Sequence, residues 1–243
     1  MTTKIIIPAR FQSSRFPGKP LVDICGQSLI ERVWKKCCIA ANEKDVYIAT
    51  DSDKIFDHCK IKNMQCIKTS DKCLTGTDRV FEAAEKLNAD LIVNVQGDEP
   101  LIDPADIVRV INTHLLNPKA IHCGMCAIKS EQDFRSASVP KVVCGPNNKL
   151  LYMSRAAIPT DKNLKFRTSM KQVCIYAFPM DALKAFASYG KKTHLESIED
   201  IEILRFMELG YDVEMVEVSD SSISVDFPED VLRVVNAIKN GAK

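Results

Sequence analysis

The sequence predicts an α/β fold with a mostly parallel central sheet and helices on both faces. Apolar runs of strand length alternate with amphipathic stretches of helical spacing through residues 4–116, as in strands joined by crossover helices. Residues 120–178 are richer in strand-like segments, and the rest of the chain returns to helix, strand and helix. No repeat or long linker interrupts the 243 residues, so we expect one domain over 1–243.

In the first half, apolar periodicity predicts four strands and four helices. The strands cover 4–9, 45–51, 64–69 and 90–96, and the helices cover 28–41, 53–62, 77–87 and 104–116. Pro104 suits the first position of the last of these helices, where its missing N–H is not needed. Each strand is therefore followed by a helix, which favours parallel pairing.

The second half has a different order of elements. Strand-like segments cover 120–129, 141–145, 149–154 and 172–178, and the polar stretch 160–171 suggests a hairpin arm at about 150–175 that leaves the main sheet. A helix is predicted over 197–209, with Ser197 as its cap and Gly210 at its end. A strand over 211–218 and a final helix over 228–240, opened by Pro228, complete the chain.

The composition excludes several classes of partner. With 33 basic and 32 acidic side chains the net charge is +1, so no general basic field exists and nucleic acid is not expected as a partner. No window contains the roughly 20 apolar residues of a membrane helix, and the apolar run before Pro8 is too short for a signal peptide. We expect a cytoplasmic protein whose cysteines are reduced, and the lone Cys123–Cys126 pair is weak support for zinc.

Polar residues follow the predicted strands at the ends where open parallel sheets bind ligands. They are Arg10, Ser13, Arg15 and Lys19 after the first strand, Asp51 and Asp53 after the second, Gln96 and Asp98 after the fourth, and Asp226 before the last helix. Basic side chains bind phosphates, and carboxylates bind Mg²⁺ that shares the phosphate oxygens. The combination fits a nucleoside triphosphate with its metal, although neither a GxGxxG nor a GxxxxGK[ST] loop is present.

Each of these features has a plainer interpretation. The basic loop could be a solvated turn, Asp98 could cap a turn, and Asp226 could interact with the dipole of the following helix. Composition and spacing leave these alternatives open. The identity of the residues around them distinguishes between the alternatives.

The opening stretch resembles the signature of nucleotide-sugar pyrophosphorylases. From Lys4 to about Ile238 the chain resembles the 3-deoxy-manno-octulosonate cytidylyltransferase family. The resemblance lies in short blocks that occur in the same order as in that family: IPARFQSSRFPGKPL, ATDSD, TGTDRV, NVQGDEPLI, KVV, LYMSRAAIP, IYAF and VDFPED. The resemblance implies a nucleotide-diphospho-sugar transferase-like fold and a homodimer to which the arm contributes. It also implies the reaction of CTP with a 3-deoxy-2-ulosonic acid to give a CMP-sugar and pyrophosphate, with Mg²⁺ as cofactor.

The resemblance also implies roles for individual residues. Arg10, Lys19, Asp98 and Asp226 would be catalytic, and the two aspartates would hold the metal, which would lower the pKa of the attacking 2-hydroxyl. The nucleotide would contact Pro8, Ala9, Arg10, Ser13, Lys19, Thr75, Gly76 and Thr77, with Asp78 and Arg79 supporting the last three. The sugar would contact Gln96, Arg155, Gln172, Tyr176, Glu202 and Ile203.

The sequence departs from the family pattern at three positions. Gln172 stands where the family has histidine, Ile203 where it has glutamine, and Phe227 where it has threonine. The isoleucine cannot hydrogen-bond a sugar hydroxyl, and such losses change substrate discrimination. The substrate could therefore be an amino-modified octulosonate or another ulosonic acid, or the departure could be drift with water as the new partner.

Two further function classes compete with cytidylyl transfer. Asp51 and Asp53 form a DxD, the metal motif of many glycosyltransferases, but no acceptor signature accompanies it. A non-catalytic CTP-binding protein is the other alternative, although it would not need Asp98 and Asp226 together with the basic loop.

Overall fold

The computed structural model describes residues 2–13 and 15–241, and its contacts divide the chain into two compact units. Unit 1 comprises residues 1–108 and 221–243, and unit 2 comprises residues 109–220. None of the described helices is long and apolar enough to cross a membrane.

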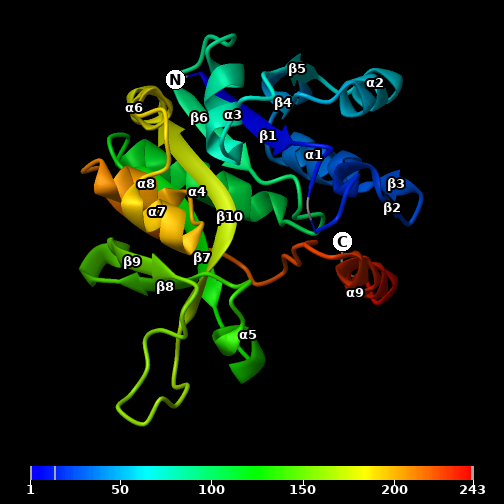
Figure 1. Ribbon diagram of the computed structural model, residues 1–243. Helices are drawn as coiled ribbons and strands as arrows, with labels where there is room; N and C mark the ends of the chain where they lie inside the picture. Colours follow the sequence, from blue (N-terminus) through cyan, green and yellow to red (C-terminus); the bar gives the residue numbers. More distant parts are fainter. Residues whose placement is uncertain (1, 14, 242–243) are drawn as a thin grey trace. The chain divides into compact units, whose positions relative to one another are not determined.

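The sheet of unit 1 is wholly parallel. Its order is β6-β1-β4-β5, formed by β1 (Thr3–Ala9), β4 (Val46–Thr50), β5 (Cys66–Lys68) and β6 (Leu91–Val95) (Figure 1). Ile5, Ile6 and Ile7 of β1 are all fully buried, because both faces of a central parallel strand are covered. This explains why β1 is a continuous apolar run and not an alternating one.

The helices of unit 1 cover both faces of its sheet. The chain runs outward from β1 to β4 and β5 through α1 (Leu29–Ala40) and α2 (Asp53–Ile61), then returns through α3 (Gly76–Ala84) to β6 on the other side of β1. Right-handed crossovers place α1 and α2 on one face and α3 on the other. The strand order therefore reverses between β1 and β6, and ligands bind at the carboxyl end of such a reversal.

Short elements complete unit 1. The loop after β1 contains the 3-10 helix η1 (Lys19–Leu21) and a small hairpin of β2 (Asp23–Ile24) with β3 (Gln27–Ser28), and η2 (Glu43–Asp45) precedes β4. Helix α4 (Pro104–Leu116) begins in this unit and α9 (Pro228–Lys239) ends it. Both helices begin at the proline that the sequence indicated.

A buried apolar cluster fixes α9 and the segment before it to unit 1. Its members come from the hairpin, from α1, from the loop after β6, from the segment before α9 and from α9, and are Ile24, Leu29, Leu101, Val225 and Val234. Burial of such side chains stabilises the arrangement by about 1.5–3 kcal/mol each. The cluster places residue 226 beside the loop that follows β1.

The sheet of unit 2 is mixed. Its order is β11-β7-β10-β8-β9, formed by β7 (Ile121–Ala127), β8 (Lys141–Cys144), β9 (Leu150–Ser154), β10 (Met170–Pro179) and β11 (Val213–Glu217). Only the pairing of β11 with β7 is parallel. The other elements are α5 (Glu131–Arg135), η3 (Pro146–Asn148), α6 (Met180–Ser188), α7 (His194–Glu199) and α8 (Ile203–Glu208). The predicted α/β class with a mostly parallel sheet is confirmed.

The single helix predicted over 197–209 is wrong. Thr193, not Ser197, caps α7, and its backbone N–H donates to the Glu196 carboxylate at 3.0 Å. Asp200 then adopts a left-handed conformation with φ of 51°, which ends α7 before α8 begins. Ser197 lies inside α7.

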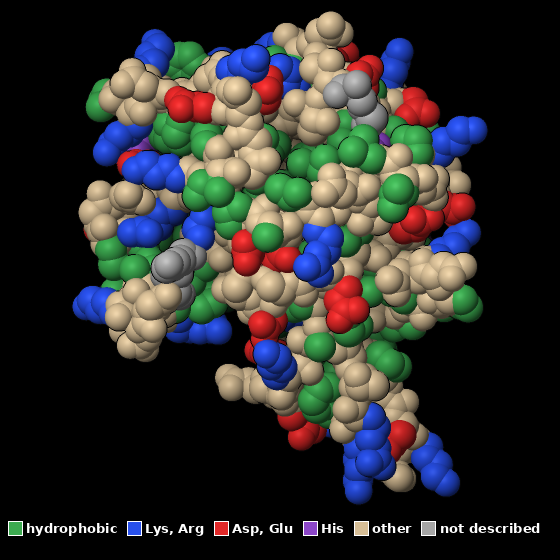
Figure 2. All heavy atoms as spheres, turned by 180° about the vertical axis from the view of Figure 1, so that it is seen from behind, with side chains coloured by type: hydrophobic (Ala, Val, Ile, Leu, Met, Phe, Trp, Pro, Cys, Tyr) green, Lys and Arg blue, Asp and Glu red, His purple; other side chains and the backbone are tan. Residues whose placement is uncertain are grey.

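The predicted arm corresponds to a connection without helix or strand, residues 155–169, between β9 and β10 (Figure 1). Both strands pair with β8, so the hairpin itself is β8 with β9. Phe166 of the connection stacks on Phe134 of α5 at a centroid distance of 4.8 Å. Exposed basic side chains, including Lys162, Lys165 and Arg167, gather on it (Figure 2).

Candidate functional site

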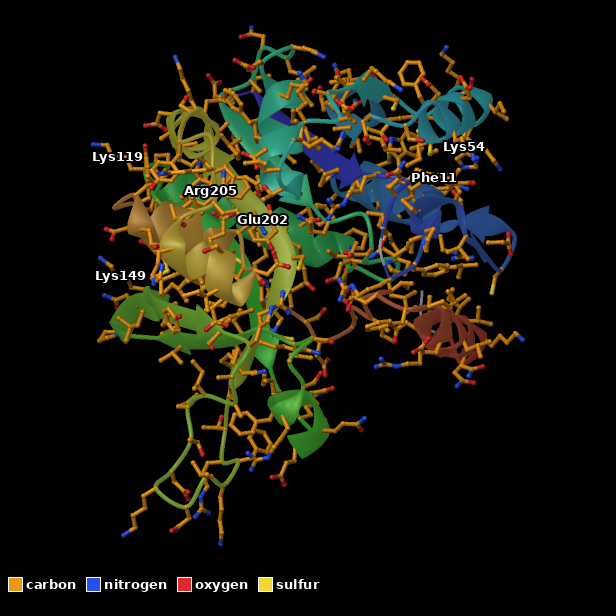
Figure 3. The ribbon with its side chains drawn as sticks, in the orientation of Figure 1. Phe11, Lys54, Lys119, Lys149, Glu202 and Arg205 are labelled. Atoms are coloured by element: carbon orange, nitrogen blue, oxygen red, sulfur yellow. The ribbon has the colours of Figure 1, made fainter. Side chains whose placement is uncertain are left out.

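The loop after β1 is held in a defined shape by its own backbone. The N–H of Gly18 donates to the carbonyl of Phe11 at 2.9 Å, and Gly18 has φ of 76°, which disfavours any residue with a side chain. Lys54 of α2 lies over the Phe11 ring at 4.5 Å (Figure 3). Lys19 follows Gly18 and is the first residue of η1, so the backbone that carries its side chain is held in place.

Lys19 joins the two aspartates that the sequence singled out. Its Nζ lies 2.9 Å from Oδ2 of Asp98 and 3.9 Å from Oδ1 of Asp226. It also donates to the carbonyl oxygen of Val225 at 2.7 Å. The backbone N–H of Val225 in turn donates to the carbonyl of Asp98 at 2.9 Å, so the two carboxylate-bearing segments are bound directly to each other.

Arg15 is the second basic residue at this site. One of its guanidinium nitrogens lies 3.0 Å from Oδ1 of Asp226, and the guanidinium lies over the Phe227 ring at 5.4 Å. Arg10 is exposed at the end of β1, and Ser13 accepts a bond from the N–H of Phe16 at 3.4 Å. The loop therefore places two cations, Arg15 and Lys19, within 4 Å of the Asp226 carboxylate.

The charge balance of the site favours a cation between the aspartates. Burial raises the pKa of Asp226, the negative charge of Asp98 raises it further, and Lys19 and Arg15 oppose both effects. A carboxylate whose pKa is raised by a second carboxylate accommodates positive charge nearby. Among the described residues no group of three or more His, Cys, Asp or Glu is arranged around a metal position, so a metal here would need further ligands from a substrate.

The first turn of α3 contains the predicted cytidine-binding residues. Thr75 caps the helix, its hydroxyl accepting from the N–H of Asp78 at 3.2 Å and donating to the Asp78 carboxylate at 2.7 Å. Buried Arg79 donates to the Thr69 hydroxyl at 2.6 Å and lies 3.3 Å from the Asp51 carboxylate. Gly76 and the buried Thr77 are the first two helical residues, so their positions depend on these supports.

Backbone close to the end of β1 has little free space. Pro8 and Ala9 are its last residues and pair with β4. A side chain at Gly97 would meet the Pro8 carbonyl at 2.9 Å, so only glycine fits there. Gln96 is half-buried directly before this contact, in unit 1.

The other predicted sugar residues lie in unit 2. Gln172 donates to the Tyr176 hydroxyl at 3.0 Å, and both belong to β10. Burial above all, with negative neighbours that include Glu202, raises the pKa of Tyr176. Glu202, near β10 (Figure 3), precedes α8, whose first residue Ile203 is 1% exposed. The structure thus brings these four residues into one region.

Arg155 is engaged by the main chain. Its three guanidinium nitrogens donate to the carbonyls of Glu199 at 2.5 Å, Ala137 at 2.8 Å and Asp200 at 2.9 Å. Its own N–H donates to the Glu199 carboxylate at 2.9 Å. These contacts hold the end of α7, and contact of Arg155 with a sugar stays a prediction.

The DxD interpretation is weakened by the contacts of both aspartates. Asp51 is paired with Arg79, and the carboxylate of Asp53 accepts from Lys68 at 2.6 Å at the start of α2. Among the described residues Asp51 and Asp53 pair with different cations, whereas the single ammonium of Lys19 lies within 4 Å of both Asp98 and Asp226. Arg15 is a residue of the basic loop for which the sequence predicted no separate role. In the structure its guanidinium contacts the Asp226 carboxylate directly.

Comparisons with known proteins connect the chain to one family. A protein-family model described as cytidylyltransferase matches residues 4–215. A 3-deoxy-manno-octulosonate cytidylyltransferase of Desulfatibacillum aliphaticivorans is 37% identical, covering 99% of this chain and all of its own. One of Geobacter metallireducens is 39% identical and covers 98% of both chains. The solved structure of CMP:2-keto-3-deoxy-manno-octonic acid synthetase complexed with CTP matches with a TM-score of 0.91 and 32% identity, covering 99% of both chains.

Proposed function

The chain belongs to the cytidylyltransferase family, and from this premise we propose that it transfers CMP from CTP to a 3-deoxy-2-ulosonic acid. The anomeric 2-hydroxyl of the sugar acid attacks the α-phosphorus of CTP. The new O–P bond forms as the bond from the α-phosphorus to the bridging oxygen breaks, pyrophosphate leaves, and the hydroxyl proton is released. The sugar is 3-deoxy-manno-octulosonate, the compound in the names of the two relatives described above.

One observation carries this proposal. Asp98 and Asp226, which are far apart in the sequence, both lie within 4 Å of the ammonium of Lys19, and Lys19 comes from the basic loop. A triphosphate bound by this loop would therefore lie beside the two carboxylates. None of the plainer interpretations, a solvated turn, a turn cap or a helix dipole, requires the three residues to meet.

The two aspartates fit Mg²⁺. They provide carboxylate oxygens, which this ion prefers, and they leave ligand positions for phosphate oxygens and water. Burial and the second carboxylate raise the pKa of Asp226, as expected where a cation would relieve the repulsion. When bound, Mg²⁺ would neutralise phosphate charge and lower the pKa of the attacking hydroxyl.

The residues of the chain orient the two anionic substrates. Arg10, Ser13 and Lys19 bind the phosphates and stabilise the charge that develops on pyrophosphate. The first turn of α3, Thr75–Thr77, lies along the cytidine. Because this turn is fixed by its cap and by Arg79, it restricts the direction in which the α-phosphorus faces the sugar.

A second candidate substrate rests on the departures in unit 2. Gln172 is committed to the Tyr176 hydroxyl, and Ile203 is buried without any side-chain polar atom. An ulosonic acid with an amino group, or a sialic-like acid, would present different donors to this region. The same CMP transfer would then act on a different sugar.

We place the protein in the cytoplasm as a homodimer that uses Mg²⁺, with the connection 155–169 contributing to the subunit contact. Its exposed Leu164 and basic side chains are available to a second copy. A CMP-activated ulosonic acid is a glycosyl donor, so its product would serve lipopolysaccharide or capsule synthesis.

Pyrophosphate release tests the proposal. Purified protein is mixed with CTP, Mg²⁺ and one of three acids: 3-deoxy-manno-octulosonate, its amino analogue or a sialic acid. Release that requires both CTP and the first acid is expected, and preference for another acid would identify the second candidate. Asp226→Asn should lose at least about 100-fold in turnover, whereas Asp57→Asn on the exposed side of α2 should not. Near-normal turnover of Asp226→Asn at saturating Mg²⁺ would contradict the metal assignment.

A further inference from the structure

We propose that Lys19 has two mutually exclusive partners, the Asp98–Asp226 pair and the nucleotide triphosphate, so that the aspartates become available to a metal ion only when a triphosphate draws Lys19 away. This rests on the proposed function, which supplies the triphosphate. It adds a coupling between two ligands: nucleotide binding raises the affinity of the aspartates for metal, and metal binding raises the affinity for nucleotide to the same extent.

The donors of Lys19 support this exclusivity. An ammonium group has three N–H donors. Two of them are used at 2.9 Å by Asp98 and at 2.7 Å by the carbonyl of Val225, and Asp226 lies 3.9 Å away, close enough for an ion pair but not for a hydrogen bond. A phosphate that takes more than one donor of this ammonium must therefore replace a contact to the aspartate segments.

The oxygen atoms of the aspartates give the second argument. Oδ2 of Asp98 and Oδ1 of Asp226 are the atoms that face Lys19. A divalent ion held by the same two carboxylates would lie beside the ammonium, and two cations in a site that is only 15–28% exposed repel strongly. Lysine and metal therefore compete for one position.

The backbone allows the side chain of Lys19 to move while the aspartates stay in place. The N–H of Lys19 donates to Phe16 and its carbonyl accepts from Val22, so the main chain of η1 is fixed. Asp98 and Val225 are bound to each other through their backbones at 2.9 Å. The flexible four-carbon stem of lysine is then the part that changes partner.

Arg15 cannot replace Lys19 in this role. Of the two aspartates Arg15 contacts Asp226, at 3.0 Å, and its side chain is 53% exposed, so solvent screens the interaction. Lys19 is 15% exposed and reaches both carboxylates. Removal of Lys19 is therefore the change that should free the pair.

The test measures Mn²⁺ binding, as a probe for Mg²⁺, in the absence of nucleotide and sugar. Electron paramagnetic resonance or calorimetry compares the wild type with Lys19→Met, and with Lys68→Met as a matched control whose lysine pairs with Asp53 elsewhere on unit 1. We expect Lys19→Met to bind Mn²⁺ at least about 10-fold more tightly than the wild type, and the control to match the wild type. Equal or weaker binding by Lys19→Met would overturn the proposal.

Two further variants locate the binding. Adding Asp98→Asn to Lys19→Met should abolish the gain, and a gain that persists would place the ion elsewhere and overturn the proposal. Lys19→Arg keeps a cation and should stay as weak as the wild type, and Lys19→Gln replaces the methionine variant if that one does not fold. The Mn²⁺ measurement involves no turnover, so it is independent of the proposed function. If the proposed function were wrong, pyrophosphate release would be absent while the Mn²⁺ affinities stayed as predicted here.

Discussion

Acid should destabilise the protein through the buried histidine pair of unit 2. Nδ1 of His114 lies 3.2 Å from Nδ1 of His122, and the two side chains are 1% and 0% exposed. Nε2 of His122 lies 3.3 Å from the Glu214 carboxylate, although without the geometry of a hydrogen bond. Burial, assisted by His122, lowers the pKa of His114 to about 4. Burial also lowers the pKa of His122, against the opposing effect of Glu214.

The sign and size of the effect follow from linkage. The folded pKa of His114 is below its usual 6.5, so the unfolded chain takes up the proton first as the pH falls. The stabilisation is complete above 6.5 and is lost as the pH falls toward 4. At about pH 4.5, a shift from 6.5 to about 4 corresponds to a loss of about 2.5 kcal/mol in the free energy of unfolding. His122 adds a loss of the same sign.

Urea unfolding at pH 8 and pH 4.5 measures this loss. Because carboxylates also titrate in this range, the informative quantity is the difference between the wild type and His114→Gln, which cannot take up the proton. The variant should lose about 2.5 kcal/mol less than the wild type between the two pH values. The NMR titration of the His114 ring provides the direct check, and a midpoint above about 6 would refute the reasoning.

Three other predictions concern single residues. Arg205→Met should lower the free energy of unfolding by about 3–5 kcal/mol, measured in urea, because Arg205 and Glu196 are 0% and 1% exposed and the carboxylate would be left unpaired. Asp230→Ala should cost about 1 kcal/mol in thermal unfolding and slow pyrophosphate release, because its carboxylate accepts from the N–H of Asp226 at 3.0 Å. If Gln172 lies in the sugar site as predicted, Gln172→His should lower the KM for 3-deoxy-manno-octulosonate and leave the KM for CTP unchanged. Equal KM values for the two proteins in steady-state kinetics would contradict the prediction that Gln172 contacts the sugar.

Most of the strands and helices could be predicted because their signals are local. The apolar run of β1 and the spacing of α1 depend only on neighbouring residues, and Pro104 and Pro228 mark the helix starts correctly. The helix predicted over 197–209 failed because its apolar spacing continues through Asp200, whose left-handed conformation leaves no trace in that pattern. Helices α5 and α6 were not predicted, since the strand-like segments around them dominated the interpretation.

The candidate site could be predicted as a set of residues but not as a set of contacts. Asp98 stood out after a predicted strand and Asp226 before the last helix, yet their proximity depends on the apolar cluster that docks α9 and on backbone bonds of Val225. Arg155 matched a family position, but its engagement with three main-chain carbonyls could not be foreseen from its identity. Backbone partners are the part of a site that side-chain patterns do not encode.

The three departures from the family pattern differ in their physical consequences. Phe227 cannot cap α9 as threonine could, but the Asp230 carboxylate accepts from the N–H groups of both Phe227 and Asp226, at 2.9 and 3.0 Å, and so satisfies them. Phe227 also gives Arg15 an aromatic face beside Asp226. Ile203 has no such compensation, because it is 1% exposed and removes a polar group from the region around Tyr176. At the proposed metal and phosphate site, neighbouring groups thus compensate for the substitution. In unit 2 the substitutions would alter the groups that a sugar meets. A difference from the relatives is therefore expected first in the choice of sugar and only then in the reaction.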